Sequence, residues 1–281
     1  MYFCTAADET YYPFLLNLLG SIFKYNNQHV KEIAVFDLGM SSDQKNEINK
    51  IDRVKIYEVE KINPLIIEPL YSNKDRWIKG LFSWKPVIIK QSLEMFPYVL
   101  YLDAGTTILN SLEDLFSHIN ENGYFFTDCG HSIRWMTTEY VVNKLNLRSE
   151  SNEWILNHDT YGVDAGLIGV NRSMIDTLVT PMVSLAREIQ NFIDDGTCPE
   201  GWGTARHDQS LFSIKAKQLN LYIPNHDRDN EQCLLKFNNT TKDIHIVHFH
   251  HRLKDDTTIF RSRRGITQEL LKHHISFLRP K

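Results

Sequence analysis

The sequence lacks several features that would place it at once in a common class. Its 281 residues hold no apolar run near the roughly 18 residues that a membrane span needs. The 4 Cys are far apart and form no C-x-x-C pair, which argues against a zinc or disulfide framework. Basic residues (31) do not outnumber acidic ones (35), so the net charge of −4 gives no general field for nucleic acid. No H-E-x-x-H motif points to a metal hydrolase.

What the sequence does contain is typical of a globular enzyme domain. Apolar residues make up 42% and charged residues 23%, and the length is enough for a substantial buried core. The N-terminus shows no charged start followed by an apolar stretch and a cleavage site. We therefore expect a cytoplasmic protein, or a catalytic domain cut from a longer chain.

The first 60 residues alternate between strand and helix patterns. Strands are predicted at 2–6, 33–36 and 54–59, with helices between them that begin near Pro13 and at the capping-box spacing Ser41–Gln44. This β-α-β-α-β order predicts an α/β fold with a parallel sheet and covering helices. Further on, the patterns predict helices at 83–96, from Ser111, at 207–217 and at 266–278, and strands at 98–102, 166–170 and 244–248; residues 61–79 and 130–162 show no clear pattern.

A carboxylate follows the apolar strand 98–102. The stretch is Tyr101-Leu-Asp103-Ala104-Gly105, so the acid is succeeded by two small residues. Ligands of open α/β sheets bind at the carboxyl ends of strands. There Asp103 could hold a divalent cation while the backbone of Ala104 and Gly105 approaches a phosphate; the alternative is an Asp that caps the next loop.

Two further acidic stretches have the same ambiguity. Asp164-Ala-Gly precedes the strand residues Leu167 to Val170 and could bring backbone close to a ligand, or could be a tight turn. His207-Asp208-Gln209 stands at a helix start, where Asp208 could act on a substrate or simply cap the helix.

The fourth stretch is rich in histidine and basic residues. It runs His245-Ile-Val-His248-Phe-His250-His251-Arg252-Leu-Lys254, and strand alternation puts His248 and His250 on one face. Imidazole is a good metal ligand, and Arg252 or Lys254 could bind phosphate oxygens. The alternative is a polar strand end with solvated histidines.

These four stretches, with Ala-Ala-Asp8-Glu-Thr-Tyr after the first strand, occur in an order that resembles the nucleotide-sugar glycosyltransferases of the GT-A fold. The likeness is to the family-8-like branch, which includes glycogenin and bacterial galactosyltransferases, and it spans residues 2–254. The resemblance implies one glycosyltransferase domain over 1–281, with a central mostly parallel sheet and helices on both faces. It further implies a nucleotide-binding half at 1–110 and an acceptor-binding and catalytic half at 111–281.

The resemblance also implies a role for each motif. The base and ribose pocket matches Thr5, Ala6, Asp8 and Tyr11 or Tyr12. Asp103 matches the first acid of the family's Asp-x-Asp motif, and His248 matches its last metal ligand. Asp164, Asp208 and Gln209 match residues beside the sugar being transferred. The implied partners are a nucleotide sugar, with UDP the expected nucleotide, and a glycan, lipid-linked or protein acceptor; nucleic acid and a transmembrane segment are not expected.

The chain departs from the family at Gly105, which stands where the second acid of Asp-x-Asp should be. We expect Mn²⁺ or Mg²⁺ held by Asp103, His248 and the donor diphosphate. In a metal-independent alternative, basic residues neutralise the diphosphate: Arg76, Lys79, Lys85, Arg252 and Lys254. The Asp208–Gln209 pair favours retention of configuration, whereas inversion would need Asp208 or Asp164 as base.

Three other functions are weighed against transfer. A sugar nucleotidyltransferase needs a Gly-rich, Arg-containing loop after the first strand, where this chain has the acidic Ala7-Asp8-Glu9-Thr10. An inactive nucleotide- or glycan-binding protein is compatible with the lost second acid. A metal hydrolase ranks last.

Overall fold

The computed structural model describes residues 1–72, 76–108, 110–199, 204–223, 234–237, 244–248 and 268–280. The chain forms two compact units whose sequence segments interleave. The first comprises 1–58, 98–125 and 227–281, and the second 59–97 and 126–226. The halves 1–110 and 111–281 of a single domain stay a prediction.

The first unit is built on a parallel sheet. Strands β1 (Tyr2–Ala7), β2 (Glu32–Asp37) and β3 (Val54–Glu58) are joined by helices α1 (Tyr12–Asn26) and α2 (Ser42–Ile48). β6 (Tyr98–Leu102) pairs with the other side of β1, so the order is β3-β2-β1-β6 with every pair parallel. The predicted α/β fold with a mostly parallel sheet is confirmed. Because β1 and β6 are neighbours, their carboxyl ends lie at the same sheet edge.

Local sequence explains where the helices of this unit begin and end. Pro13 lies in the first turn of α1, and Ser41 and Gln44 form the predicted capping box of α2. Helix α4 (Glu113–Asn122) ends at Gly123, whose φ of 90° is the left-handed conformation that glycine adopts freely. The Ser111 hydroxyl accepts from the Glu113 amide at 3.3 Å at the start of α4, although Leu112 holds the N-cap position and makes no side-chain cap bond.

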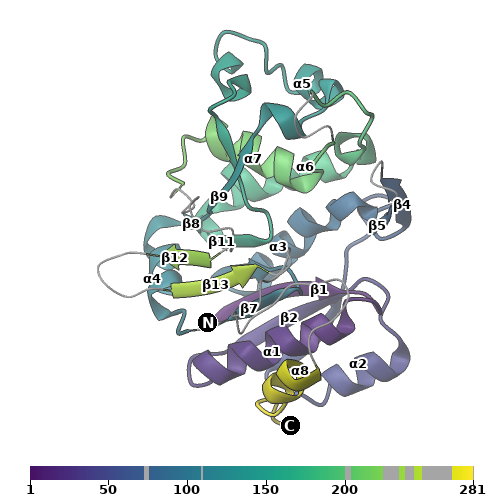
Figure 1. The fold of residues 1–281 in the computed structure, drawn as a ribbon, viewed down its shortest axis with the longest axis vertical. Helices are drawn as coiled ribbons and strands as arrows, with labels where there is room; N and C mark the ends of the chain where they lie inside the picture. Colours follow the sequence, from purple (N-terminus) through teal and green to yellow (C-terminus); the bar gives the residue numbers. More distant parts are fainter. Residues whose placement is uncertain are drawn as a thin grey trace. The chain divides into compact units, whose positions relative to one another are not determined.

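Three antiparallel strands and a last helix complete the first unit. β13 (Ile244–His248) pairs with β12 (Leu234–Phe237) on one side and with β7 (Thr106–Ile108) on the other. Helix α8 (Gln268–Ile275) lies beside α1 (Figure 1). The helices approach so closely that a Cβ on Gly20 would lie 2.2 Å from the His274 carbonyl oxygen. β8 (Tyr124–Phe125) follows α4.

The contact between α1 and α8 includes a buried polar chain. Asn17 donates to Thr107 Oγ1 at 2.6 Å, which leaves its Oδ1 to accept from Nδ1 of His274 at 2.5 Å. Burial, together with the charges of Lys24 and His273, lowers the pKa of His274 to about 4. The His274 ring is therefore neutral at pH 7 when α8 is packed against α1.

The second unit has shorter elements. A hairpin of β4 (Pro69–Ser72) and β5 (Arg76–Lys79) lies within the stretch that showed no pattern. The 3-10 turn η1 (Gly80–Phe82) then leads into α3 (Trp84–Met95). The remaining elements used below are β9 (Asp128–Ser132), α5 (Glu139–Lys144), β10 (Tyr161–Val163), β11 (Leu167–Asn171), α6 (Thr180–Ala186) and α7 (Asp208–Gln218). Within the described residues, no helix has the length and apolar character of a membrane-spanning segment.

Candidate functional site

Asp103 occupies the predicted position at the carboxyl end of a parallel strand. It follows β6 directly and is half-buried. The Tyr101 hydroxyl donates to its Oδ1 at 2.6 Å, and its carbonyl accepts from the Thr106 amide at 2.9 Å. Ala104 and Gly105 form the buried turn between these two bonds. The carboxylate is thus oriented by a neighbour on its own strand, as a binding group needs to be.

The end of β1 lies at the same edge. Cys4 is in register with Tyr101, so the residues after β1 come next to those after β6. Asp8 Oδ1 accepts from the Tyr11 amide at 3.0 Å and shapes the turn into α1. Tyr11 is 40% exposed, whereas Tyr12 is buried and donates its hydroxyl to Glu47. Of the two tyrosines expected near a base, Tyr11 is therefore the one with an accessible ring.

Strand pairing brings the backbone of His248 to the turn that follows Asp103. In the pairing of β7 with β13, His248 stands opposite Thr106, three residues after Asp103. This register brings the ends of two segments that are about 145 residues apart in sequence to one place in the first unit. The predicted contributions of Lys254, Arg252 and His250 lie outside the described residues.

Buried hydroxyl groups accompany these residues. Thr5 in β1 and Thr106 in β7 are at most 2% exposed, and their Oγ1 atoms have no hydrogen-bond partner among the residues that the structure describes. Buried polar atoms are normally satisfied, so these two hydroxyls are exceptions, and hydroxyl and carboxylate oxygens are the kinds of ligand that suit a hard divalent cation. The described residues contain no group of three or more His, Cys, Asp and Glu arranged for a metal. These residues fit a cation that takes part of its coordination from a ligand.

The second unit contains a buried ion pair at the motif around Asp208. Lys85 Nζ lies 2.7 Å from Asp208 Oδ2 and donates to the Ala165 carbonyl at 2.9 Å. Both side chains are about 4% exposed. Asp208 does not cap its helix, since His207 holds the N-cap position and no side-chain cap bond forms there. The helix-capping interpretation of Asp208 is wrong, and Lys85 is engaged with this acid.

Asp164 and Gln209 lie in the same cluster. Asp164 Oδ1 accepts from the Gly166 amide at 2.9 Å, the tight turn that small residues predict, and its side chain is half-buried. Gln209 Nε2 lies 3.8 Å from the Met136 sulfur. Burial raises the pKa of the Cys129 thiol to about 12, with Asp164 contributing. Asp164 and Gln209 both contribute to the pKa of this thiol, so both motifs lie near it.

Arg206 and Cys129 were not among the predicted site residues. Burial lowers the pKa of the Arg206 guanidinium, while the charges of Asp164 and Asp208 oppose that shift. Arg206 therefore lies among the acids of the cluster. Its place two residues before Asp208 was the only sequence signal, and Cys129 carried none.

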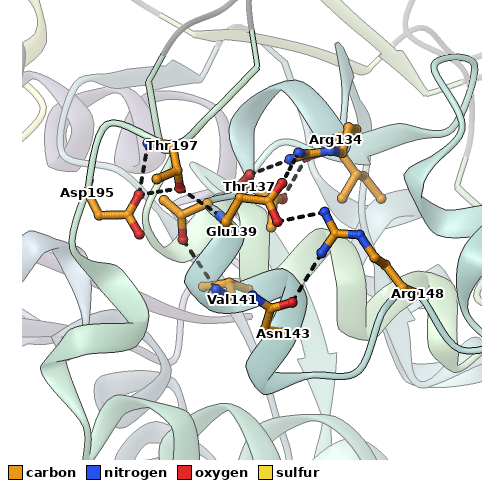
Figure 2. A network of polar contacts seen from close by, with 10 residues as sticks. Arg134, Thr137, Glu139, Val141, Asn143, Arg148, Asp195 and Thr197 are labelled. Atoms are coloured by element: carbon orange, nitrogen blue, oxygen red, sulfur yellow. Dashed lines mark hydrogen bonds and ion pairs between the residues drawn. The ribbon is translucent and has the colours of Figure 1, made fainter.

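A network of charged groups holds the segment that precedes α7. The Glu139 carboxylate accepts from Arg134 and from Arg148, the latter at 2.6 Å (Figure 2). The Glu139 amide donates to Thr197 Oγ1 at 2.8 Å, and that hydroxyl donates to Asp195. The segment around Thr197 is thereby tied to the first turn of α5.

The predicted site residues thus form two groups. Asp8, Tyr11, Asp103 and the His248 backbone share an edge of the first unit. Lys85, Asp164, Asp208 and Gln209 share a cluster in the second unit. The convergence of Asp103, Asp164, Asp208 and His248 on one cleft involves both units and stays a prediction.

Comparison with known proteins gives matches among solved structures alone. No family model matches the chain, and no curated protein matches it. The galactosyltransferase LgtC, in complex with donor and acceptor sugar analogues, is 12% identical with a TM-score of 0.48, over 99% of this chain and 96% of that one. Mouse xyloside xylosyltransferase 1 is 11% identical with a TM-score of 0.47, over 79% of this chain and 84% of its own.

A third match differs in length. The bifunctional glycosyltransferase WbbM is 12% identical with a TM-score of 0.47 over 80% of this chain, which spans only 38% of the WbbM chain. At such identities, and with TM-scores below 0.5, the activity of this chain has to follow from its own residues.

Proposed function

We propose that this chain is a glycosyltransferase that moves a sugar from a nucleoside-diphosphate donor, with UDP the expected nucleotide, to a hydroxyl group of a glycan or similar acceptor. The observation that carries the proposal is the placement of Asp103. An oriented carboxylate stands at the carboxyl end of a central parallel strand, and β13 brings the backbone of His248 to the turn that follows it. This is the sheet edge at which α/β folds bind nucleotides.

In the first unit we assign donor recognition. Tyr11 offers an accessible ring for stacking on a base, and Asp8 offers a carboxylate to its polar edge. Thr5 and Ala6 line the end of β1 as buried residues. The small Ala104 and Gly105 let backbone approach the phosphates, because neither presents a bulky side chain.

Asp103, with His248, would hold a divalent cation together with the diphosphate. Bound there, a cation neutralises the negative charge that grows on the diphosphate as its bond to the sugar breaks. Gly105 contributes no carboxylate, so fewer than three charged protein ligands are available in the described part of this site. We therefore expect the cation and the nucleotide to bind more tightly together than either does alone.

In the second unit we assign the reaction at the sugar. The bond from the sugar C1 to the diphosphate oxygen breaks and the oxygen keeps the electron pair. The acceptor oxygen bonds to C1, and its proton passes to the departing diphosphate oxygen. Gln209 presents a neutral amide toward the developing positive charge on the sugar ring, which favours retention. Asp208 is engaged by Lys85, whereas Asp164 is half-exposed, so Asp164 is the better candidate to contact an acceptor hydroxyl.

The test measures donor binding and transfer together. Wild type is incubated with UDP-sugars and GDP-sugars, with and without an acceptor mixture, in Mn²⁺, Mg²⁺ or EDTA. We expect nucleotide release for one donor class, stimulated by Mn²⁺ and abolished by EDTA. Asp103→Asn and Asp208→Asn should lose it, while the matched exposed variants Asp43→Asn and Asp176→Asn should not.

Thermal unfolding separates the alternatives. A nucleotide present at about 100 times its Kd stabilises the fold by about 2.7 kcal/mol. Stabilisation without any turnover would identify an inactive nucleotide-binding protein. Absence of both stabilisation and turnover with every donor would overturn the proposal. Full activity in EDTA would show that basic side chains, and not a cation, neutralise the diphosphate.

A further inference from the structure

Two segments with unusual backbone lie next to the Lys85–Asp208 pair. Gly80, Leu81 and Phe82 all have positive φ, at 51°, 48° and 63°, directly before the helix that carries Lys85. His207 has φ 48° and ψ −117°, directly before Asp208. Residues with a Cβ avoid these conformations, and strained positions persist only where the surroundings impose them.

The close packing around Gly80 shows one such constraint. Its amide donates to the Glu68 carbonyl at 2.8 Å, and a Cβ at this position would lie 1.8 Å from the Ile66 carbonyl oxygen. The preceding residues Ile66 and Glu68 thus fix the left-handed conformation that begins at Gly80. It delivers the Phe82 side chain to the first turn of α3.

The side chains of the two strained segments meet. The Phe82 ring lies 6.0 Å from the His207 ring, centroid to centroid, and Lys85 Nζ lies 5.4 Å from the Phe82 centroid. The residue His207 is 5% exposed, and its Nδ1 lies 2.6 Å from the Phe192 carbonyl oxygen. Since a carbonyl only accepts, this nitrogen carries the proton and donates.

We propose that Phe82 and His207 form an aromatic brace that positions the Lys85–Asp208 pair, with His207 as a positioning residue of the reaction. Helix α3 brings the ammonium and α7 brings the carboxylate, so their 2.7 Å separation depends on how the two helix starts are held. The brace holds one start against the other, and the bond to Phe192 fixes the orientation of the His207 ring. The inference rests on the proposed function for its kinetic consequence only.

Three substitutions at His207 separate positioning from stability. His207→Ala removes the donor and keeps a Cβ in the strained conformation. His207→Gly removes the donor and relieves the strain. His207→Asn keeps an N–H donor at the same distance from Cβ, and asparagine tolerates positive φ better than most residues.

Positioning predicts a pattern that stability does not. His207→Ala and His207→Gly should lower kcat about 10-fold or more while donor KM changes little, because misplacement of a reacting group costs rate rather than binding. Unfolding should show the Gly variant as the more stable of the two, and Asn should recover most of the rate. Phe82→Leu should lower kcat in the same way, whereas the exposed control Trp154→Leu should not.

A second measurement does not depend on the reaction. The coupling between Lys85 and Asp208 is obtained from urea unfolding of Lys85→Met, Asp208→Asn and the double variant, in wild-type and His207→Ala backgrounds. The brace predicts that the coupling falls by more than half in the His207→Ala background. Unchanged coupling would overturn it, as would rates that simply follow stability. If wild type transfers no sugar, the proposed function fails. The coupling energy between Lys85 and Asp208 then tests on its own whether the brace positions this pair.

Discussion

Replacing Lys85 by methionine should unfold this protein far more easily than its surface substitutions would. The change leaves an unbranched apolar side chain that lacks the terminal atom, and it removes the ammonium that lies 2.7 Å from Asp208 Oδ2. At an effective dielectric constant of about 20, two unit charges at this separation attract by about 6 kcal/mol. Desolvation of both groups offsets part of this, and breaking a buried pair typically costs about 3–5 kcal/mol.

The matched double variant tests whether charge is the cause. Asp208→Asn alone leaves a buried ammonium whose hydrogen bond to the Ala165 carbonyl does not neutralise it. We expect the double variant Lys85→Met with Asp208→Asn to lose less than half of the free energy of unfolding that either single variant loses, because no unpaired charge then stays buried. If the loss came from packing, the double variant would instead lose more than either single variant.

Urea unfolding followed by tryptophan fluorescence measures these differences. A domain with about 5–15 kcal/mol of stability should show a clear fall in the urea midpoint for each single variant and an unchanged slope. Transfer activity should be absent from all three variants, because the pair belongs to the proposed site. A Lys85→Met midpoint equal to that of wild type would refute the buried, paired state of Asp208.

Three further predictions concern the first unit. Gly20→Ala should lower the free energy of unfolding by about 1–3 kcal/mol through overpacking against the His274 carbonyl. Helix propensity alone predicts the opposite, a gain of about 1 kcal/mol. Hydrogen exchange should show faster exchange in α8 and unchanged exchange in α2. The free energy of unfolding should fall by up to about 3 kcal/mol from pH 6.5 toward pH 4, because His274 has a pKa of about 4 in the fold and about 6.5 in the unfolded chain, which therefore binds the proton at higher pH. A flat profile, or the same slope in His274→Asn, would contradict this. Tyr101→Phe should weaken Mn²⁺-dependent nucleotide binding by roughly 5-fold, about 1 kcal/mol for one lost hydrogen bond, as calorimetric titration would show against the unchanged control Tyr71→Phe.

The parallel sheet could be predicted because its signals are local. Pro13, the Ser41–Gln44 capping box and the apolar runs each determine structure within a few residues, and the parallel order follows from their alternation. The hairpin of β4 and β5 was not predicted, because Pro69 opens it where proline usually interrupts a regular pattern. The helix predicted from Ser111 begins at Glu113, and the Ser111 hydroxyl accepts from the Glu113 amide one residue before the N-cap position.

The site was predictable in its acids and not in what surrounds them. Asp103 and Asp208 follow from their places at a strand end and a helix start. That Lys85 pairs with Asp208 depends on packing between helices 123 residues apart, which no local pattern records. Arg206 and Cys129 likewise enter the cluster through tertiary packing, and a positive φ such as that of His207 is uncommon for residues with a Cβ and carries no mark in the sequence.

The pairing of β7 with β13 bears on the order in which the protein is made. Thr106 leaves the ribosome about 140 residues before its partner His248, and the whole of the second unit's later segment is synthesised between them. Contacts so distant in sequence form late, because a long loop has to close first. The strand that follows Asp103 therefore waits with an open edge while that segment emerges. In a nascent chain β7 gains its partner strand only after His248 has emerged, and a ribosome stalled before that point would present the open edge to cellular chaperones.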